Sequence, residues 1–109
     1  MSPWPKRGDI WLVALDPTVG SEIQKTRPCV VISPAELNEH LHTVIVAPMT
    51  TGSRLALFRV PITLQRKHGL VLLDQIRTLD RQRLVKKVGR VPAATLVSTL
   101  AVLRALFAP

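Results

Sequence analysis

Few side chains in this sequence are suited to acid–base chemistry. Histidine occurs at His40, His42 and His68, and two histidines can cleave a phosphodiester that carries its own nucleophile. These histidines flank an expected helical turn and strand start, or stand in the turn-like run 66–69 (RKHG). Such contexts favour solvated loop histidines over catalytic ones.

Arginine is the more abundant candidate for chemistry on phosphate. Eight of the ten arginines lie between Arg27 and Arg90, and residues 54–90 hold ten cationic side chains but only two acids. Guanidinium forks match phosphate geometry, so this block and the net charge of +8 favour a polyanionic partner, nucleic acid above all. The alternative is a merely soluble basic surface, because composition alone supports binding without sequence recognition.

The sequence offers few side chains for thiol or metal chemistry. Cys29 is the only cysteine, so no internal disulfide or multi-cysteine zinc site can form, and its apolar run CVVI is typical of a small buried side chain. No carboxylate cluster suited to Mg²⁺ is evident, and we predict no metal or cofactor. The lone cysteine, the absence of a leader-like start and the absence of about 18 consecutive apolar residues predict a cytoplasmic protein.

The elements that must position these side chains are short. Strands are expected at residues 9–15, 27–33, 44–47, 57–62 and 84–91. Residues 70–79 begin apolar and then alternate, residues 16–26 form a long polar loop, and Gly89 interrupts an alternating strand as a bulge would. One domain over residues 1–109 is predicted, mainly β (α+β), with a small, strongly bent antiparallel sheet or barrel.

The last expected element is a helix over residues 93–107. Its apolar stripe recurs at helical spacing and is formed by Leu96, Leu100, Leu103 and Phe107. Arg104 is its only charged side chain. Two interpretations stay open: a helix that covers the core, or one whose surface also forms a subunit interface.

Four segments, in order, resemble the MazF/PemK (Kid) toxin family. They are 7–11 (RGDIW), 16–33 (DPTVGSEIQKTRPCVVIS), 48–51 (PMTT) and 74–79 (DQIRTL). Together they span nearly the whole chain and are far more specific than any one alone. The resemblance implies an SH3-like barrel with a C-terminal helix (the CcdB/PemK-like fold) and a homodimer. It also implies an acidic, MazE-like antitoxin partner whose disordered tail covers the active groove.

The same resemblance implies the toxin of a type II toxin–antitoxin system, a metal-independent endoribonuclease that cuts single-stranded RNA such as mRNA and so inhibits translation and growth. The family's key arginine falls on Arg27 and its key threonine on Thr50. Attack of the 2′-hydroxyl on the adjacent phosphorus would leave 2′,3′-cyclic phosphate and 5′-hydroxyl ends, with Arg27 and Thr50 stabilising the phosphoryl oxygens. Taken alone, Arg27 could be a surface arginine and Thr50 a turn cap.

Further RNA contacts are predicted around this pair. The predicted RNA-binding residues are Glu22, Lys25, Thr51, Ser53, Gln75, Arg77, Arg81 and Arg83. The Gln75 amide suits a base edge and the arginines suit phosphate, although each could be a solvated side chain and Glu22 could serve to shape the long loop. Trp4 and Trp11, with no tyrosine in the chain, make a poor stacking platform.

Two other functions remain open from the sequence. A non-enzymatic gyrase poison of the CcdB type would share the fold, but those toxins resemble one another in a Trp-Gly-Ile ending, whereas this chain ends in LFAP. The second is a basic module that holds RNA without cutting it. Incubation of the pure protein with labelled RNA in EDTA separates these alternatives.

Overall fold

Antiparallel strands form most of the structure, a computed structural model that describes residues 4–52 and 55–109. In chain order its elements are β1 (Asp9–Ala14), β2 (Thr26–Val31), α1 (Ala35–His40), β3 (Thr43–Thr50), β4 (Arg59–Leu64), β5 (Lys67–Leu72), the 3₁₀ turn η1 (Leu73–Gln75), β6 (Arg77–Asp80), the 3₁₀ turn η2 (Arg81–Arg83), β7 (Leu84–Arg90) and α2 (Ala93–Phe107). The mainly β class with a C-terminal helix is therefore confirmed.

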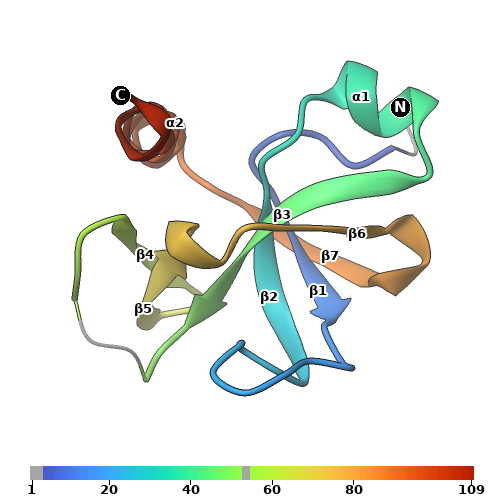
Figure 1. Cartoon of the computed structure of the whole chain (residues 1–109), viewed down its shortest axis with the longest axis horizontal. Helices are drawn as coiled ribbons and strands as arrows, with labels where there is room; N and C mark the ends of the chain where they lie inside the picture. Colours follow the sequence, from blue (N-terminus) through green and yellow to red (C-terminus); the bar gives the residue numbers. More distant parts are fainter. Residues whose placement is uncertain (1–3, 53–54) are drawn as a thin grey trace.

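Strand β3 connects two parts of a curled sheet. The strand order is β4-β5-β3-β2-β1-β7, and β6 pairs with β3 outside this path. The first half of β3, from Thr43 to Val46, pairs with β6, and its end, Met49 and Thr50, pairs with β5. Because β3 changes partner along its length, the sheet bends there, and β3 crosses the centre of the molecule (Figure 1).

The central strands bury side chains on both faces. One cluster, the helix-side core, holds Ile10, Val30 and Met49 and is covered by α2 and the β4–β5 hairpin. The other, the barrel core, holds Val13 and Cys29 with Val31, Val44, Val46 and Leu79. Successive side chains of a strand point to opposite faces, so a strand between two cores reads as a continuous apolar run.

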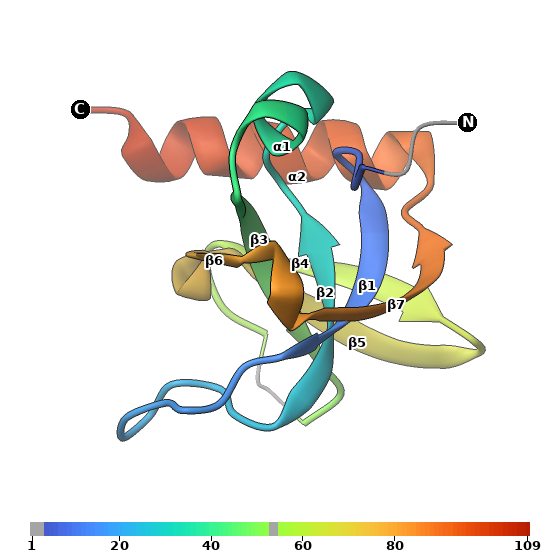
Figure 2. The same cartoon turned by 90° about the vertical axis from the view of Figure 1, so that its right-hand side faces the viewer.

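The helix α2 has the bounds that the sequence predicts, but its buried stripe differs. Leu103 is buried, and Leu96, Leu100, Val102 and Leu106 pack against the helix-side core. The expectation for Phe107 is wrong, because its side chain is 71% exposed at the last turn of the helix. The helix lies along one side of the sheet and keeps its outer face uncovered (Figure 2). Among the described residues, no helix combines the length and apolar character needed to cross a bilayer.

The β4–β5 hairpin differs most from the sequence expectation. Strand β4 begins at Arg59, and the turn consists of Gln65 and Arg66, which lie immediately before Lys67. His68 is consequently part of strand β5, so its placement in a turn was wrong. The bulge predicted near Gly89 is confirmed, because Ile10 pairs with Gly89 while the next residue of β1 pairs with Lys87.

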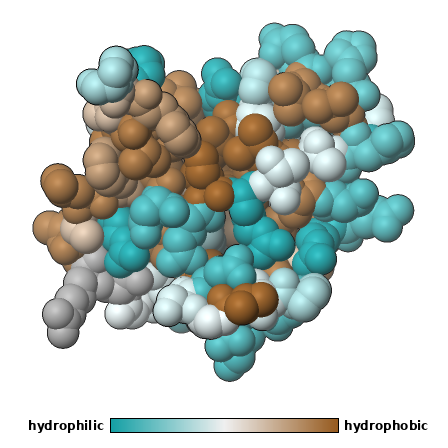
Figure 3. Space-filling model, viewed as in Figure 1, coloured by the Kyte–Doolittle hydropathy of each residue, from teal (hydrophilic) through white to brown (hydrophobic). Residues whose placement is uncertain are grey.

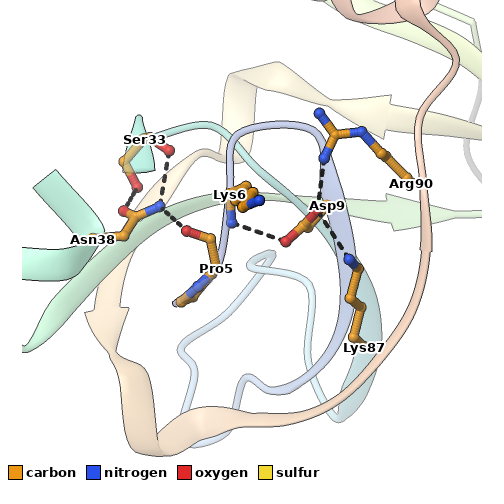
Figure 4. A network of polar contacts seen from close by, with 7 residues as sticks. All are labelled: Pro5, Lys6, Asp9, Ser33, Asn38, Lys87 and Arg90. Carbon is orange, nitrogen blue, oxygen red and sulfur yellow. Dashed lines mark hydrogen bonds and ion pairs between the residues drawn. The ribbon is translucent and has the colours of Figure 1, made fainter. Parts of the chain in front are cut away.

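Two buried polar side chains tie the N-terminal segment to the sheet (Figure 4). The Asp9 carboxylate accepts from the backbone N–H of Lys6 at 2.8 Å and forms ion pairs with Lys87 at 3.5 Å and Arg90 at 3.0 Å. Fully buried Asn38 donates through Nδ2 to the carbonyls of Pro5 and Ser33 at 2.8 and 3.0 Å. These contacts hold α1, the N-terminal segment and the edge strand β7 in place.

Replacement of Asn38 tests the second contact. In Asn38→Leu the buried carbonyls of Pro5 and Ser33 lose their donor, so the free energy of unfolding should fall by about 2–3 kcal/mol. Urea unfolding measures the change. Glu39→Ala, at an exposed neighbour on the same helix, is the control and should stay within about 0.5 kcal/mol of wild type. A loss for Asn38→Leu no larger than that of the control would contradict the role assigned to Asn38.

Candidate active site

Arg27 and Thr50 meet at one cavity because their strands are neighbours. Cys29 of β2 pairs with Pro48 of β3 in an antiparallel ladder, which places the start of β2 beside the end of β3. The cavity, of about 250 Å³ and hereafter the Arg27 cavity, is lined by Arg27, Pro28, Met49, Thr50, Thr51, Leu64, Gln65, Lys67 and Gly69. Residues 23 positions apart in the sequence thus face the same space.

The Arg27 side chain is half-buried, and a hydrogen bond from its Nε atom orients it. Its Nε donates to the carbonyl of Gln24 at 3.1 Å. Among the described residues no hydrogen-bond partner is found for its two terminal nitrogens. The guanidinium therefore presents its outer edge, the part that binds a phosphate in bidentate fashion.

Thr50 forms the turn contact that the sequence offered as one of its two possible roles, and this contact is compatible with the other role. Its Oγ1 accepts from the backbone N–H of Gly52 at 3.3 Å, as a turn cap does. A hydroxyl has one donor and two acceptor lone pairs, so this contact leaves the proton of Thr50 available. Thr50 can thus donate to a phosphate oxygen while its own position is fixed.

Gly69 determines how closely β5 approaches Thr50. A Cβ at this position would lie 2.7 Å from the backbone oxygen of Thr50. Sequence reasoning took Gly69 as a turn residue and missed this contact. The available signal was a glycine at the start of the apolar run 70–73, since glycine inside a strand often marks a close approach of two backbones.

A second cavity, of about 420 Å³, gathers three of the predicted RNA-binding residues. It is lined by Ser21, Glu22, Ile23, Asp74, Gln75, Ile76 and Arg77. The Gln75 Oε1 accepts from the backbone N–H of Ile23 at 2.9 Å, and the Glu22 carboxylate accepts from that of Val19 at 2.7 Å. Both side chains therefore shape the long loop as well as facing the cavity.

The structure distributes the other predicted RNA-binding residues more widely. Thr51 lines the Arg27 cavity, Lys25 is exposed, and Ser53 lies outside the described residues. Arg81 lies at a third cavity, with its guanidinium 4.3 Å from the centroid of the Trp4 ring. Arg83 donates to the carbonyls of Ala14 and Asp16. The structure thus does not bring Arg81 to the Arg27 cavity.

The histidines and carboxylates lie apart from the Arg27 cavity. His40 ends α1, His42 lines the third cavity, and His68 Nδ1 lies 2.9 Å from Thr63 Oγ1 on the neighbouring strand. In the described part of the chain no three His, Cys, Asp or Glu side chains are grouped so as to hold a metal ion. The polar side chains that line the cavity are Arg27, Thr50, Thr51, Gln65 and Lys67.

Two pKa shifts are structural in origin. The hydrogen bond and charge of Arg59, whose Nη2 lies 3.1 Å from Asp74 Oδ2, lower the pKa of the Asp74 carboxyl. This ion pair fixes η1, and with it Gln75, against β4. Burial raises the pKa of the Cys29 thiol to about 12, so Cys29 is the small buried side chain that its neighbours predict.

Comparison with known proteins places this chain in a family. Residues 6–107 match the PemK-like, MazF-like toxins of type II toxin–antitoxin systems, and the chain belongs to that family. It is 43% identical to the endoribonuclease PemK of Escherichia coli over 93 residues, which cover 80% of this chain and 70% of that protein. It is 38% identical to the endoribonuclease MazF of Staphylococcus epidermidis over 89 residues, covering 76% and 74%. These relatives assign the chain to the toxin endoribonucleases.

Solved structures share the fold. MazF from Deinococcus radiodurans superimposes with a TM-score of 0.83 at 29% identity, over 96% of this chain and 97% of that one. A mycobacterial endoribonuclease in complex with its cognate antitoxin gives a TM-score of 0.80 at 26% identity, over the same shares of the two chains. The curled sheet with a C-terminal helix is thus the fold of MazF.

Substitution of Gly69 tests the geometry of the site. In Gly69→Ala the new methyl group must displace the Thr50 backbone, and misplacement of a reacting group by about 1 Å can cost on the order of a hundredfold in rate. We expect at least a tenfold loss of RNA cleavage, measured on a fluorogenic oligonucleotide. Gly89→Ala serves as the control, since its Cβ would meet Leu64 at an ordinary 3.5 Å. Equal activity of the two variants would refute the positioning role of Gly69.

Proposed function

We propose that this toxin cleaves single-stranded RNA at short sequences, without a metal ion, by attack of the 2′-hydroxyl on the adjacent phosphorus. The products are a 2′,3′-cyclic phosphate and a 5′-hydroxyl end. The observation that carries the proposal is the shared cavity of Arg27 and Thr50, in which both side chains keep hydrogen-bond donors available. Cleavage of mRNA in this way would inhibit translation and growth.

Arg27 and Thr50 would stabilise the phosphate in different ways. As the oxygen attacks, negative charge grows on the phosphoryl oxygens, and fixed donors stabilise this charge more in the transition state than in the ground state. The Arg27 guanidinium supplies a permanent positive charge, and a group that stays protonated suits this electrostatic role better than that of a base. The Thr50 hydroxyl supplies a neutral donor, and Lys67 adds a second cation at the cavity wall.

Three of the other predicted RNA-binding residues offer a second place of contact for the RNA. Glu22, Gln75 and Arg77 line one cavity together, where the Gln75 amino group still has donors to offer a base. The net charge of +8 attracts RNA at a distance. The two alternatives that the sequence left open, a CcdB-like gyrase poison and a non-cleaving RNA-binding module, do not fit relatives that are endoribonucleases at 43% and 38% identity.

Substitutions in the Arg27 cavity test the mechanism. We expect wild-type protein to cut single-stranded RNA in EDTA and leave 5′-hydroxyl ends, and Arg27→Ala or Thr50→Val to lower the rate by roughly a hundredfold or more. His68→Ala should cleave at nearly the wild-type rate, because His68 lies outside the cavity. Gel analysis of labelled RNA gives rates and ends. Strict dependence on Mg²⁺, or activity that survives Arg27→Ala but not His68→Ala, would overturn the mechanism.

We also propose that the toxin is a cytoplasmic homodimer that an acidic, MazE-like antitoxin inhibits. One solved relative is an endoribonuclease in complex with its cognate antitoxin, and others are MazE–MazF structures. On this chain the outer face of α2 leaves Val97 67% exposed, and apolar surface gathers over α2 and over the loop before β4 (Figure 3). A second subunit would cover part of this surface and place two basic surfaces side by side for RNA or for an acidic segment.

Light scattering coupled to size exclusion tests the dimer. Wild type at micromolar concentration should have twice the chain mass. The Val97→Asp dimer should dissociate at higher protein concentrations than the wild-type dimer, because the substitution buries a carboxylate at the proposed interface. Val85→Asp, at a similarly exposed valine of β7, should keep the wild-type mass. A monomeric wild type contradicts the dimer, and a bound acidic antitoxin that leaves RNA cleavage intact contradicts inhibition at the groove.

A further inference from the structure

The turn of the β4–β5 hairpin has an unfavourable backbone for its residues. Leu64 and Lys67 are the last paired residues, so Gln65 and Arg66 form a two-residue loop. Both have positive φ, 51° and 66°, as a type I′ turn requires. Such turns favour Asn-Gly, because most side chains clash with the backbone in the left-handed region. The chain thus keeps two residues here that local energetics disfavour.

One of these residues faces the active site and the other does not. Gln65 lines the Arg27 cavity together with its neighbours Leu64 and Lys67, whereas Arg66 is absent from the lining. The left-handed turn therefore places Gln65 beside the residues proposed to hold the scissile phosphate. Residues in unfavourable conformations cluster at functional sites, where a side chain is needed in a particular place.

The amide of Gln65 is free to bind a ligand. Among the described residues no hydrogen bond of its side chain is found, whereas the Oε1 of Gln75 is already engaged by Ile23. A glutamine amide offers an acceptor and two donors side by side, the pattern that pairs with a base edge. Unpaired bases in single-stranded RNA expose such edges.

We propose that Gln65 reads the edge of one unpaired base next to the scissile phosphate, and that this is why the turn retains a glutamine. The inference rests on the proposed RNA cleavage and identifies a specificity-determining residue for it. A base with the matching donor and acceptor satisfies the Gln65 amide. A base with the wrong edge makes fewer hydrogen bonds with this amide, which is solvent-exposed in the free protein, and is therefore cleaved more slowly.

Two single substitutions separate base recognition from turn energetics. Gln65→Asn keeps the amide and relieves the turn, because asparagine tolerates the left-handed region, but withdraws the amide by one methylene group. Arg66→Gly relieves the same turn and leaves Gln65 unchanged. Loss of the Arg66 charge should weaken the binding of all RNA sequences alike. The ratio of kcat/KM between two RNA sequences therefore reports base recognition separately from this charge effect. Both variants should raise the Tm, which shows that the hairpin still folds.

The experiment measures kcat/KM for oligonucleotides that carry each base in turn at the positions flanking the cleaved bond. We expect Gln65→Asn to lower the wild-type preference at one position by about tenfold, with the other positions unchanged, and Arg66→Gly to keep the wild-type preferences. An unchanged profile for Gln65→Asn overturns the inference, and so does an equal loss on every RNA. A wild-type protein that cuts no RNA would instead refute the proposed function itself.

Discussion

The burial of β1, β2 and β3 on both faces is the constraint on which the remaining structure depends. Val30 faces the helix-side core while Cys29 and Val31 face the barrel core, so the middle of β2 has no room for a polar side chain. An unpaired charge buried there would cost several kcal/mol. Polar chemistry is therefore confined to strand ends, and the start of β2 and the end of β3 bring Arg27 and Thr50 together.

The basic character of the chain serves the fold as well as the partner. Arg77 donates to the Leu15 carbonyl, Arg81 to that of Asn38 and Arg83 to that of Ala14, and Arg90 pairs with Asp9. Each contact joins segments far apart in the sequence and helps to close the curled sheet. A guanidinium has five N–H donors, so Arg77, Arg81 and Arg83, whose partners are neutral carbonyls, keep donors and their charge for a phosphate, whereas the charge of Arg90 is paired with Asp9. Arginine thus fits both roles better than lysine would.

The sequence predicted those parts of the fold that depend on interactions between residues close together in the chain. Strand β1, helix α2 and the bulge beside Gly89 follow from local periodicity, which one segment contains by itself. The hairpin turn was missed because neither Gln65 nor Arg66 is a typical turn residue, whereas Gly69, a few residues later, is one. The exposure of Phe107 depends on where the sheet ends beneath α2, which the helix sequence does not contain.

The site itself required information beyond periodicity. The pairing of Cys29 with Pro48 brings Arg27 to Thr50, but strand register is a long-range property, and only the family resemblance linked the two residues beforehand. The contact of Gly69 with the Thr50 backbone is likewise a product of β5 pairing with the end of β3.

The central claim is that the RNA supplies the nucleophile and the protein supplies only donors and charge. The most direct test uses an oligonucleotide containing a cleavage site, prepared once as all-ribose RNA and once with a single 2′-deoxyribose at the nucleotide whose hydroxyl would attack. In EDTA, the account predicts that wild-type protein cuts the first at that site and leaves the second intact there while still binding it. Cleavage of the 2′-deoxy substrate at the same bond would contradict the account, because the nucleophile would then come from water or from the protein.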